Sequence, residues 1–172
     1  DALRKSKVQI ELLTLSEEDL RSSTDVFPIK FLDIKRNHVI YRGKDVMSDL
    51  EISRDNLRLR CEQEIKNLML RLRLNYVSRK QNSKSIASLL NRIYLSLIRN
   101  LGVLVELKSG DVLVTNSDII KGVGKLGIDI MALHDVEKLR QDNFSIELED
   151  RKRLLEKVMQ CVREAAAMAD KL

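Results

Sequence analysis

The chain has 172 residues, 44% of them apolar and 33% charged, which suits a packed domain with a charged surface and excludes a disordered chain. No run of about 18 apolar residues occurs and no signal peptide is visible, so we expect a cytoplasmic protein with no membrane contact. The net charge of +5 is compatible with an acidic partner such as a nucleotide or a nucleic acid.

The first 45 residues read as a small α/β piece. Residues 8–12 alternate apolar and polar side chains and predict a half-buried strand. Ser16 is followed by three acids, which favours a short helix capped by Ser16. Residues 27–34 read as a second strand with Pro28 at its start, because proline cannot donate a ladder hydrogen bond. A brief strand at 39–41 and a turn at Arg42-Gly43 follow.

From about residue 48 the pattern becomes helical. One apolar stripe runs over about six turns at spacings of three and four. It consists of Leu57, Cys61, Ile65, Leu68, Leu72 and Tyr76. Residues 54–84 also hold nine Lys or Arg against three acids, a local charge of +6, so the rest of the chain nearly cancels. Such a basic surface can attract a polyanion, although a charge run is more often a solvated helix face.

A polar stretch at 78–85 ends this helix, and Asn82 or Ser83 can cap the next one. The following helix has a wide apolar face that predicts a central position in a bundle. Its residues are Ile86, Leu89, Leu90, Ile93, Tyr94, Leu97, Ile98 and Leu101. Residues 103–115 allow two interpretations. They form a hairpin around Ser109-Gly110, or the helix continues to about Lys108 and a loop follows, which we favour.

Three more helices are predicted over 117–126, 130–141 and 146–171. Ser145 is the expected cap of the last one, with acids in its first turn. Its apolar line is Leu154, Leu155, Val158, Val162, Ala165, Ala166 and Ala169. We therefore expect a predominantly α fold, in which the α/β piece of residues 1–45 precedes an antiparallel helical bundle of residues 46–172.

The stretch KGVGKLG, residues 121–127, matches three nucleotide or nucleic-acid motifs on paper. A dinucleotide fingerprint needs a preceding strand, and a KH clamp needs a three-stranded sheet; neither is predicted here. A helix-hairpin-helix turn through Gly122 and Gly124 has the right order and would expose amides to a phosphate. The simpler interpretation is a helix that ends at Gly127, with Ile128 packing back and Asp129 capping the next helix.

Cysteine and histidine give no sign of a catalytic or metal site. Cys61 and Cys161 both fall on apolar stripes, which predicts small buried hydrophobes rather than a disulfide, and their separation excludes a C-x-x-C site. His38 and His134 are far apart and lack ligand-like neighbours in the sequence, so we predict no catalytic role for either.

Several pieces of residues 25–77 carry a family resemblance. They are Asp25-Val26-Phe27-Pro28, Phe31-Leu32-Asp33-Ile34, Tyr41-Arg42-Gly43-Lys44-Asp45, and the run from Leu57 to Glu64. They resemble bacterial nucleotidyltransferase-like proteins of the DNA polymerase β superfamily, in the kanamycin-nucleotidyltransferase branch. About 50 residues match well, and the helical remainder is compatible in outline.

The resemblance implies nucleotidyl transfer from a nucleoside triphosphate with Mg²⁺, which favours carboxylate ligands. The family's Gly-Ser turn and Asp-x-Asp pair are absent from this chain, so we expect no catalysis and no cofactor in the chain alone and an N-terminal catalytic segment upstream of Asp1. Asp33 is the candidate for the third carboxylate by position, although position 30, acidic in the family pattern, is Lys30 here.

In that family the C-terminal helical domain shapes the substrate side or the dimer contact. The resemblance therefore implies a homo-oligomer, or a helix that faces the nucleotide or acceptor. The candidate binding residues on the basic helix are Arg58, Arg60, Arg71 and Arg73. Two other classes remain open, namely a basic nucleic-acid binder that uses the Gly122–Gly127 turn and a purely oligomerising bundle.

Overall fold

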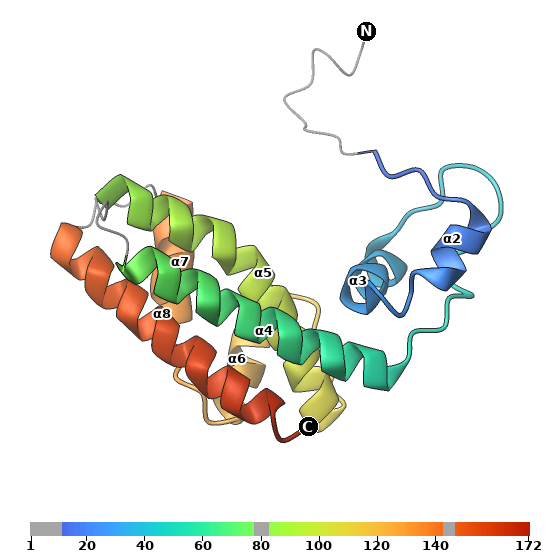
Figure 1. The fold of residues 1–172 in the computed structure, drawn as a ribbon. Helices are drawn as coiled ribbons and strands as arrows, with labels where there is room; N and C mark the ends of the chain where they lie inside the picture. Colours follow the sequence, from blue (N-terminus) through green and yellow to red (C-terminus); the bar gives the residue numbers. More distant parts are fainter. Residues whose placement is uncertain (1–11, 78–82, 143–146) are drawn as a thin grey trace, which may run out of the picture. The chain divides into compact units, whose positions relative to one another are not determined.

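The computed structural model describes residues 12–77, 83–142 and 147–172. The chain divides into two compact units, Asp1–Ile52 and Ser53–Leu172. Figure 1 shows the ribbon, in which every described element is a helix. None of the described helices combines the length and the apolar character that a membrane crossing requires.

The described part of the first unit holds two helices, α2 (Glu17–Ser22) and α3 (Pro28–Asn37). Ser16 caps α2 as predicted: its hydroxyl accepts from the Asp19 amide at 3.0 Å, and the Asp19 carboxylate accepts from the Ser16 amide at 3.2 Å. A small core holds the unit together. It consists of Leu20, Phe31 and Leu50, with Ile34, Val46, Met47 and Ile52 packed against it.

The strand predicted at 27–34 is wrong, because these residues begin α3. Pro28 occupies the first turn of the helix, where its missing amide hydrogen costs nothing. Phe31 and Ile34, three residues apart, then face the small core together. Residues 39–41 form no strand either. The strand expected at 8–12 lies outside the described residues except for Leu12, so no α/β piece is seen in the described part of the unit.

Three long helices form the core of the second unit: α4 (Arg54–Val77), α5 (Ser83–Ser109) and α8 (Leu148–Ala169). Each packs against the other two, as Figure 1 shows. The Tyr76 hydroxyl at the end of α4 donates to Glu156 in the first half of α8 at 2.8 Å, and Lys66 in the middle of α4 pairs with Asp170 just after α8. The two helices therefore run antiparallel. The predicted bundle is confirmed, although α4 begins at Arg54 rather than near residue 48.

The apolar stripes predicted for these helices form the core. On α4, Leu57, Cys61, Ile65, Leu68 and Leu72 are buried, and Tyr76 at the end of the stripe is exposed. The whole predicted face of α5 is buried, and so is the line on α8 except for the half-buried Ala166. The periodicity of the sequence therefore identified the interior.

The helical interpretation of residues 103–108 is confirmed, because α5 continues to Ser109 and residues 110–114 form no hairpin. Gly110 adopts φ +83° as the chain leaves the helix. Two shorter helices follow, α6 (Asn116–Lys125) against α5 and α7 (Met131–Asp142) against α5 and α8. The caps proposed at Asn82 and Ser145 lie outside the described residues.

Candidate functional site

The four arginines predicted to bind a nucleotide or acceptor all lie on α4, but their surroundings differ. Arg60 pairs with Glu64 at 2.6 Å, and Arg58 lies 3.9 Å from Glu62. Each is an i,i+4 pair in which a carboxylate offsets the positive charge. Arg71 and Arg73 are exposed and make no ion pair with any residue in the described part of the chain. The unbalanced positive charge of α4 thus lies in its second half.

The same helix exposes a row of large apolar side chains, which we call the outer ridge: Leu59, Leu70, Leu74 and Val77. They are 51%, 55%, 72% and 78% exposed, respectively. At 100° per residue they lie on the side of α4 opposite its buried stripe, and Arg71 and Arg73 flank the ridge on its two sides. A helix that is apolar on both faces normally has a partner on both.

Polar contacts join α4 to α8. The Lys66 ammonium lies 2.6 Å from the carboxylates of both Asp170 and Glu62. The hydrogen bond that Lys66 donates to Asp170, followed by the one that it donates to Glu62, raises the pKa of Lys66. At the other end, the hydrogen bond to Glu156 raises the pKa of Tyr76. These two contacts tie the middle and the end of α4 to α8.

Asp33, the candidate third carboxylate, lies on α3 and not on a strand. One of its carboxylate oxygens accepts from the Asn37 side-chain amide at 3.1 Å. Within the ranges that the structure describes, no group of three His, Cys, Asp or Glu side chains is arranged to hold a metal ion.

The glycines of KGVGKLG lie inside a helix and at its end. Gly122 and Gly124 belong to α6, so the helix-hairpin-helix geometry, which needs them in a turn, is not formed there. A Cβ on Gly122 would lie 2.5 Å from Leu113 Cδ1 and 3.2 Å from Val105 Cγ1. Close packing of α6 against α5 and the 110–115 loop thus explains a glycine that costs helix propensity.

Gly127 ends α6 as predicted. It has φ +83°, and its amide donates to the Gly124 carbonyl at 2.9 Å. The Ile128 amide reaches back to the Val123 carbonyl at 3.5 Å, and Ile128 is buried. These are the two bonds of a Schellman motif. Asp129 then accepts from the Met131 amide at 2.9 Å, which satisfies a free amide at the start of α7.

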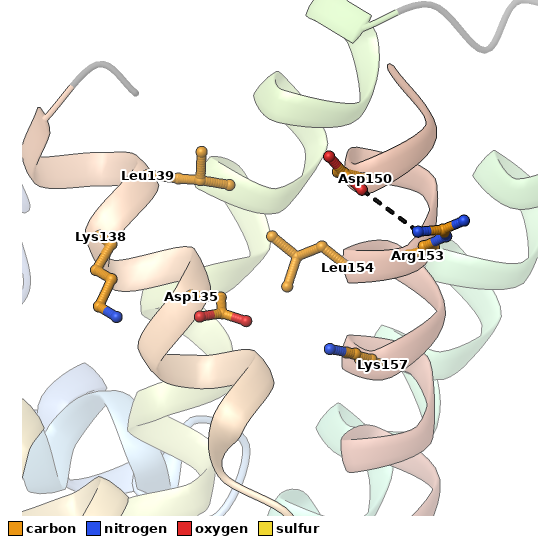
Figure 2. A pocket seen from close by; sticks show the side chains of 7 residues that line it. All are labelled: Asp135, Lys138, Leu139, Asp150, Arg153, Leu154 and Lys157. Atoms are coloured by element: carbon orange, nitrogen blue, oxygen red, sulfur yellow. Dashed lines mark ion pairs between the residues drawn. The ribbon is translucent and has the colours of Figure 1, made fainter. Parts of the chain in front are cut away.

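A hollow of about 340 Å³ lies between α7 and α8 (Figure 2). Its lining residues are Asp135, Lys138, Leu139, Asp150, Arg153, Leu154 and Lys157. Three cations face two carboxylates, and Arg153 lies 3.6 Å from Asp150. Because these charges nearly cancel, the hollow has little preference for an anion, and the outer ridge with its two arginines is the more distinctive surface.

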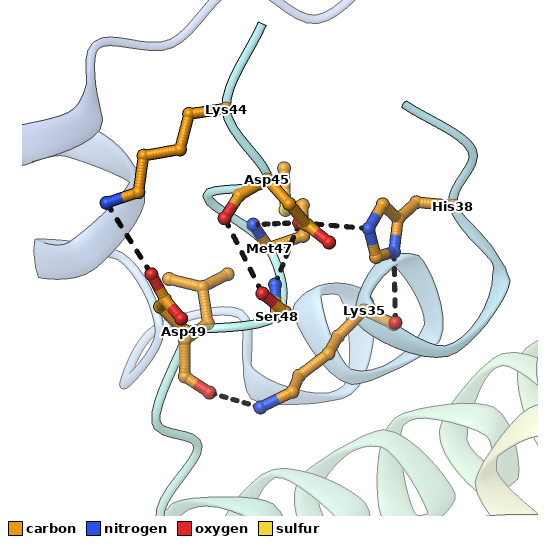
Figure 3. A network of polar contacts seen from close by, with 8 residues as sticks. Lys35, His38, Lys44, Asp45, Met47, Ser48 and Asp49 are labelled. Carbon is orange, nitrogen blue, oxygen red and sulfur yellow. Dashed lines mark hydrogen bonds and ion pairs between the residues drawn. The ribbon is translucent and has the colours of Figure 1, made fainter. Parts of the chain in front are cut away.

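The first unit contains a polar network around His38, shown in Figure 3. The imidazole Nε2 lies 3.1 Å from an oxygen of Asp45, and Nδ1 lies 3.0 Å from the Lys35 carbonyl oxygen. Sequence reasoning found no partner for His38, because Asp45 is seven residues further on and only the fold of the 39–45 segment brings it back.

The outer ridge was also missed, although its signal was in the sequence. Leu59, Leu70 and Leu74 stand outside the buried stripe of α4, and a second apolar stripe on one helix indicates a second contact. Comparison with known proteins adds nothing to these residues, since no family model, curated protein or solved structure matches the chain.

Proposed function

We propose that this chain is the helical contact domain of a nucleotidyltransferase-like protein, inactive alone, and that the outer ridge of α4 is its dimer contact. The observation that carries the proposal is the ridge itself, four large apolar side chains exposed on a helix whose opposite face is already buried. Exposed apolar side chains that gather along one helix mark interaction sites in water-soluble proteins. The resemblance of residues 25–77 supports the family assignment.

A second copy of the chain is the occupant that fits the ridge best. Gln63 and Asn67 lie in the middle of the ridge, with Leu59 before them and Leu70 and Leu74 after them. The order apolar, polar, apolar is the same from either end. An antiparallel two-fold pairing centred between residues 66 and 67 would place Leu59 of one copy opposite Leu74 of the other, and would keep Arg71 and Arg73 of one copy away from the same two residues of the other.

The mass in solution tests this proposal. We expect light scattering to give twice the 19.8 kDa of the chain over a dilution series, and Leu70→Glu with Leu74→Glu to reduce it to the single-chain value. Glutamate keeps the helix propensity of leucine, so α4 should remain folded, which circular dichroism checks.

Val114→Glu is the matched control, because Val114 is also largely exposed but lies in the loop before α6. It should leave the mass at twice the single-chain value. A single-chain mass for the unsubstituted protein at every concentration, or a dimer that survives the double substitution, would rule out the ridge as a dimer contact.

Arg71 and Arg73 favour a second candidate, in which the second half of α4 faces the triphosphate of a nucleotide on the substrate side. Unpaired guanidinium groups bind phosphate oxygens well. Titration calorimetry with a magnesium nucleoside triphosphate should then give an affinity that falls about tenfold or more on Arg71→Gln or Arg73→Gln, since a charge-assisted hydrogen bond contributes about 1.5–3 kcal/mol.

Arg58→Gln and Arg60→Gln are the controls for this titration, because Glu62 and Glu64 already offset those charges. No binding, or equal loss in all four variants, would count against a substrate-side role for the second half of α4. The family assignment itself is tested by the coding sequence upstream of Asp1, which should encode a Gly-Ser turn followed by an Asp-x-Asp pair. Its absence would overturn the assignment.

A further inference from the structure

His38 closes a short loop at the end of α3. The chain leaves α3 at Asn37, runs through residues 39–44 and returns to His38 at Asp45. Figure 3 shows the contact between the two side chains. The loop exposes Val39 and Tyr41 almost completely, and Gly43 at φ +97° allows its turn. The imidazole is only 19% exposed, so its partners are mainly protein atoms.

Both ring nitrogens of His38 face groups that can only accept a hydrogen bond. Nδ1 faces the carbonyl oxygen of Lys35, and Nε2 faces the carboxylate of Asp45. A neutral imidazole has one N–H and can donate to only one of them, whereas the imidazolium donates to both. Both hydrogen bonds can therefore form at once only when each ring nitrogen carries a proton.

Asp45 is well placed to stay ionised beside this ring. The oxygen that faces Nε2 also accepts from the Met47 and Ser48 amides, each at 3.0 Å. These bonds, the amide of Ser48 foremost, lower the pKa of Asp45. A carboxylate with two amide donors remains an acceptor through the range in which histidine titrates.

The other charged groups near the ring engage different partners. On α3, the Lys35 ammonium donates to the Leu50 carbonyl at 2.7 Å, and Arg36 is exposed. On the returning segment, the Lys44 ammonium lies 3.7 Å from Asp49. The hydrogen bond from Lys35 to Leu50 and the small core therefore keep the chain around Leu50 in place without a contribution from the imidazole.

We infer that His38 is a pH-sensitive clip, which in its doubly protonated form pins Asp45 to the end of α3 and so closes the 39–44 loop. Loss of the ring proton removes one of the two hydrogen bonds and the attraction to Asp45, and the loop opens while Leu50 stays in place. The hydrogen bond to Asp45 is also the main cause that raises the pKa of His38.

The pH dependence of the clip follows from the raised pKa of His38. A pKa raised in the folded state means that the clip stabilises the unit fully below the ordinary histidine pKa of about 6.5, and that this stability is lost as the pH rises through the folded value. Opening is thus expected as the pH rises above the ordinary histidine pKa rather than in acid.

NMR titration of the histidine ring protons tests the clip. The chain has two histidines, so His38→Asn assigns the signals. We expect the pKa of His38 to lie above about 6.5 and to fall in Asp45→Asn. The Met47 and Ser48 amide signals should shift with the same midpoint, and hydrogen exchange at these amides should accelerate above it.

Asp49→Asn is the matched control, because Asp49 belongs to the same segment but pairs with Lys44 instead of the ring. It should leave the His38 midpoint unchanged. A His38 pKa at or below 6.5, a pKa unaffected by Asp45→Asn, or ring ¹⁵N shifts that show a single N–H at pH 6 would each overturn the clip. All variants are checked for fold by the same spectra.

Discussion

The two cysteines show how far a single residue can be read from its position in a pattern. Both were expected to be small buried hydrophobes, and both are buried and free. Burial raises the pKa of each thiol to about 12, with a smaller contribution from nearby carboxylates. The reactive species is the thiolate, so neither residue is suited to nucleophilic or redox chemistry in the folded chain.

This inertness can be measured with a thiol reagent. At pH 8 we expect almost no reaction of the native protein with an aromatic disulfide such as DTNB over minutes, because a thiol of pKa about 12 is only about one part in ten thousand thiolate there. In denaturant both thiols should react at once. A native thiol that reacts as fast as the denatured one would show that Cys61 or Cys161 is accessible.

Contacts between residues that meet only because the chain folds back could not be predicted from periodicity. Periodicity shows which side of a helix is buried, and it correctly placed Ile65 and Leu101 in the core. It says nothing about which carboxylate meets His38 across a loop. Apolar periodicity also does not distinguish Arg71 from Arg60. The difference is that a glutamate, Glu64, lies four residues after Arg60, whereas Asn75 lies four residues after Arg71. This difference is visible in the sequence, but it was not a criterion in choosing the four candidate arginines.

At the scale of one element, residues 27–34 show why a short segment can fit both a strand and a helix. Phe27, Ile29 and Phe31 alternate with other residues as in a strand, and Pro28 is acceptable at the start of a strand. Proline is equally acceptable in the first turn of a helix. A window of eight residues fits both periods, and the packing of Phe31 and Ile34 against Leu20 decides for the helix.

Alanine substitutions at Gly124, inside α6, and at Gly127, just after it, should change the stability in opposite directions. Gly127→Ala should lower the free energy of unfolding by about 1–2 kcal/mol, because alanine is strained at φ +83°. Gly124→Ala should raise it by up to about 1 kcal/mol, because alanine is the better helix former and its Cβ would meet only the end of the Ile130 side chain at 3.3 Å. Urea denaturation measures both.

Gly122→Ala separates packing from propensity within the same helix. Its Cβ would displace Leu113 and press on the branched Val105, so we expect it to be less stable than Gly124→Ala despite the same gain in helix propensity. Equal stability of the two variants would mean that the 110–115 loop moves aside freely, and close packing would then no longer explain Gly122.

At the scale of the whole molecule, the hydrophobic interior is divided very unevenly. The first unit buries the large apolar side chains Leu20, Ile29, Phe31 and Leu50. Every other buried hydrophobic side chain in the described ranges, apart from Pro28 of the first unit, belongs to residues 53–172. The long aliphatic helices account for this, and their apolar stripes are what predicted a bundle. Over the described residues 12–52, a core of so few side chains is small.

We therefore predict that residues 53–172 fold alone, whereas residues 1–52 do not. The longer fragment should keep its helical circular dichroism and a cooperative thermal transition within a few degrees of the full chain, because its core lies within the fragment. Residues 1–52 should show little helix and no cooperative transition, since helices of six and ten residues are too short to persist without a larger core. If residues 53–172 melted far below the full chain, the first unit would have to contribute to the stability of the bundle, and the prediction would be wrong.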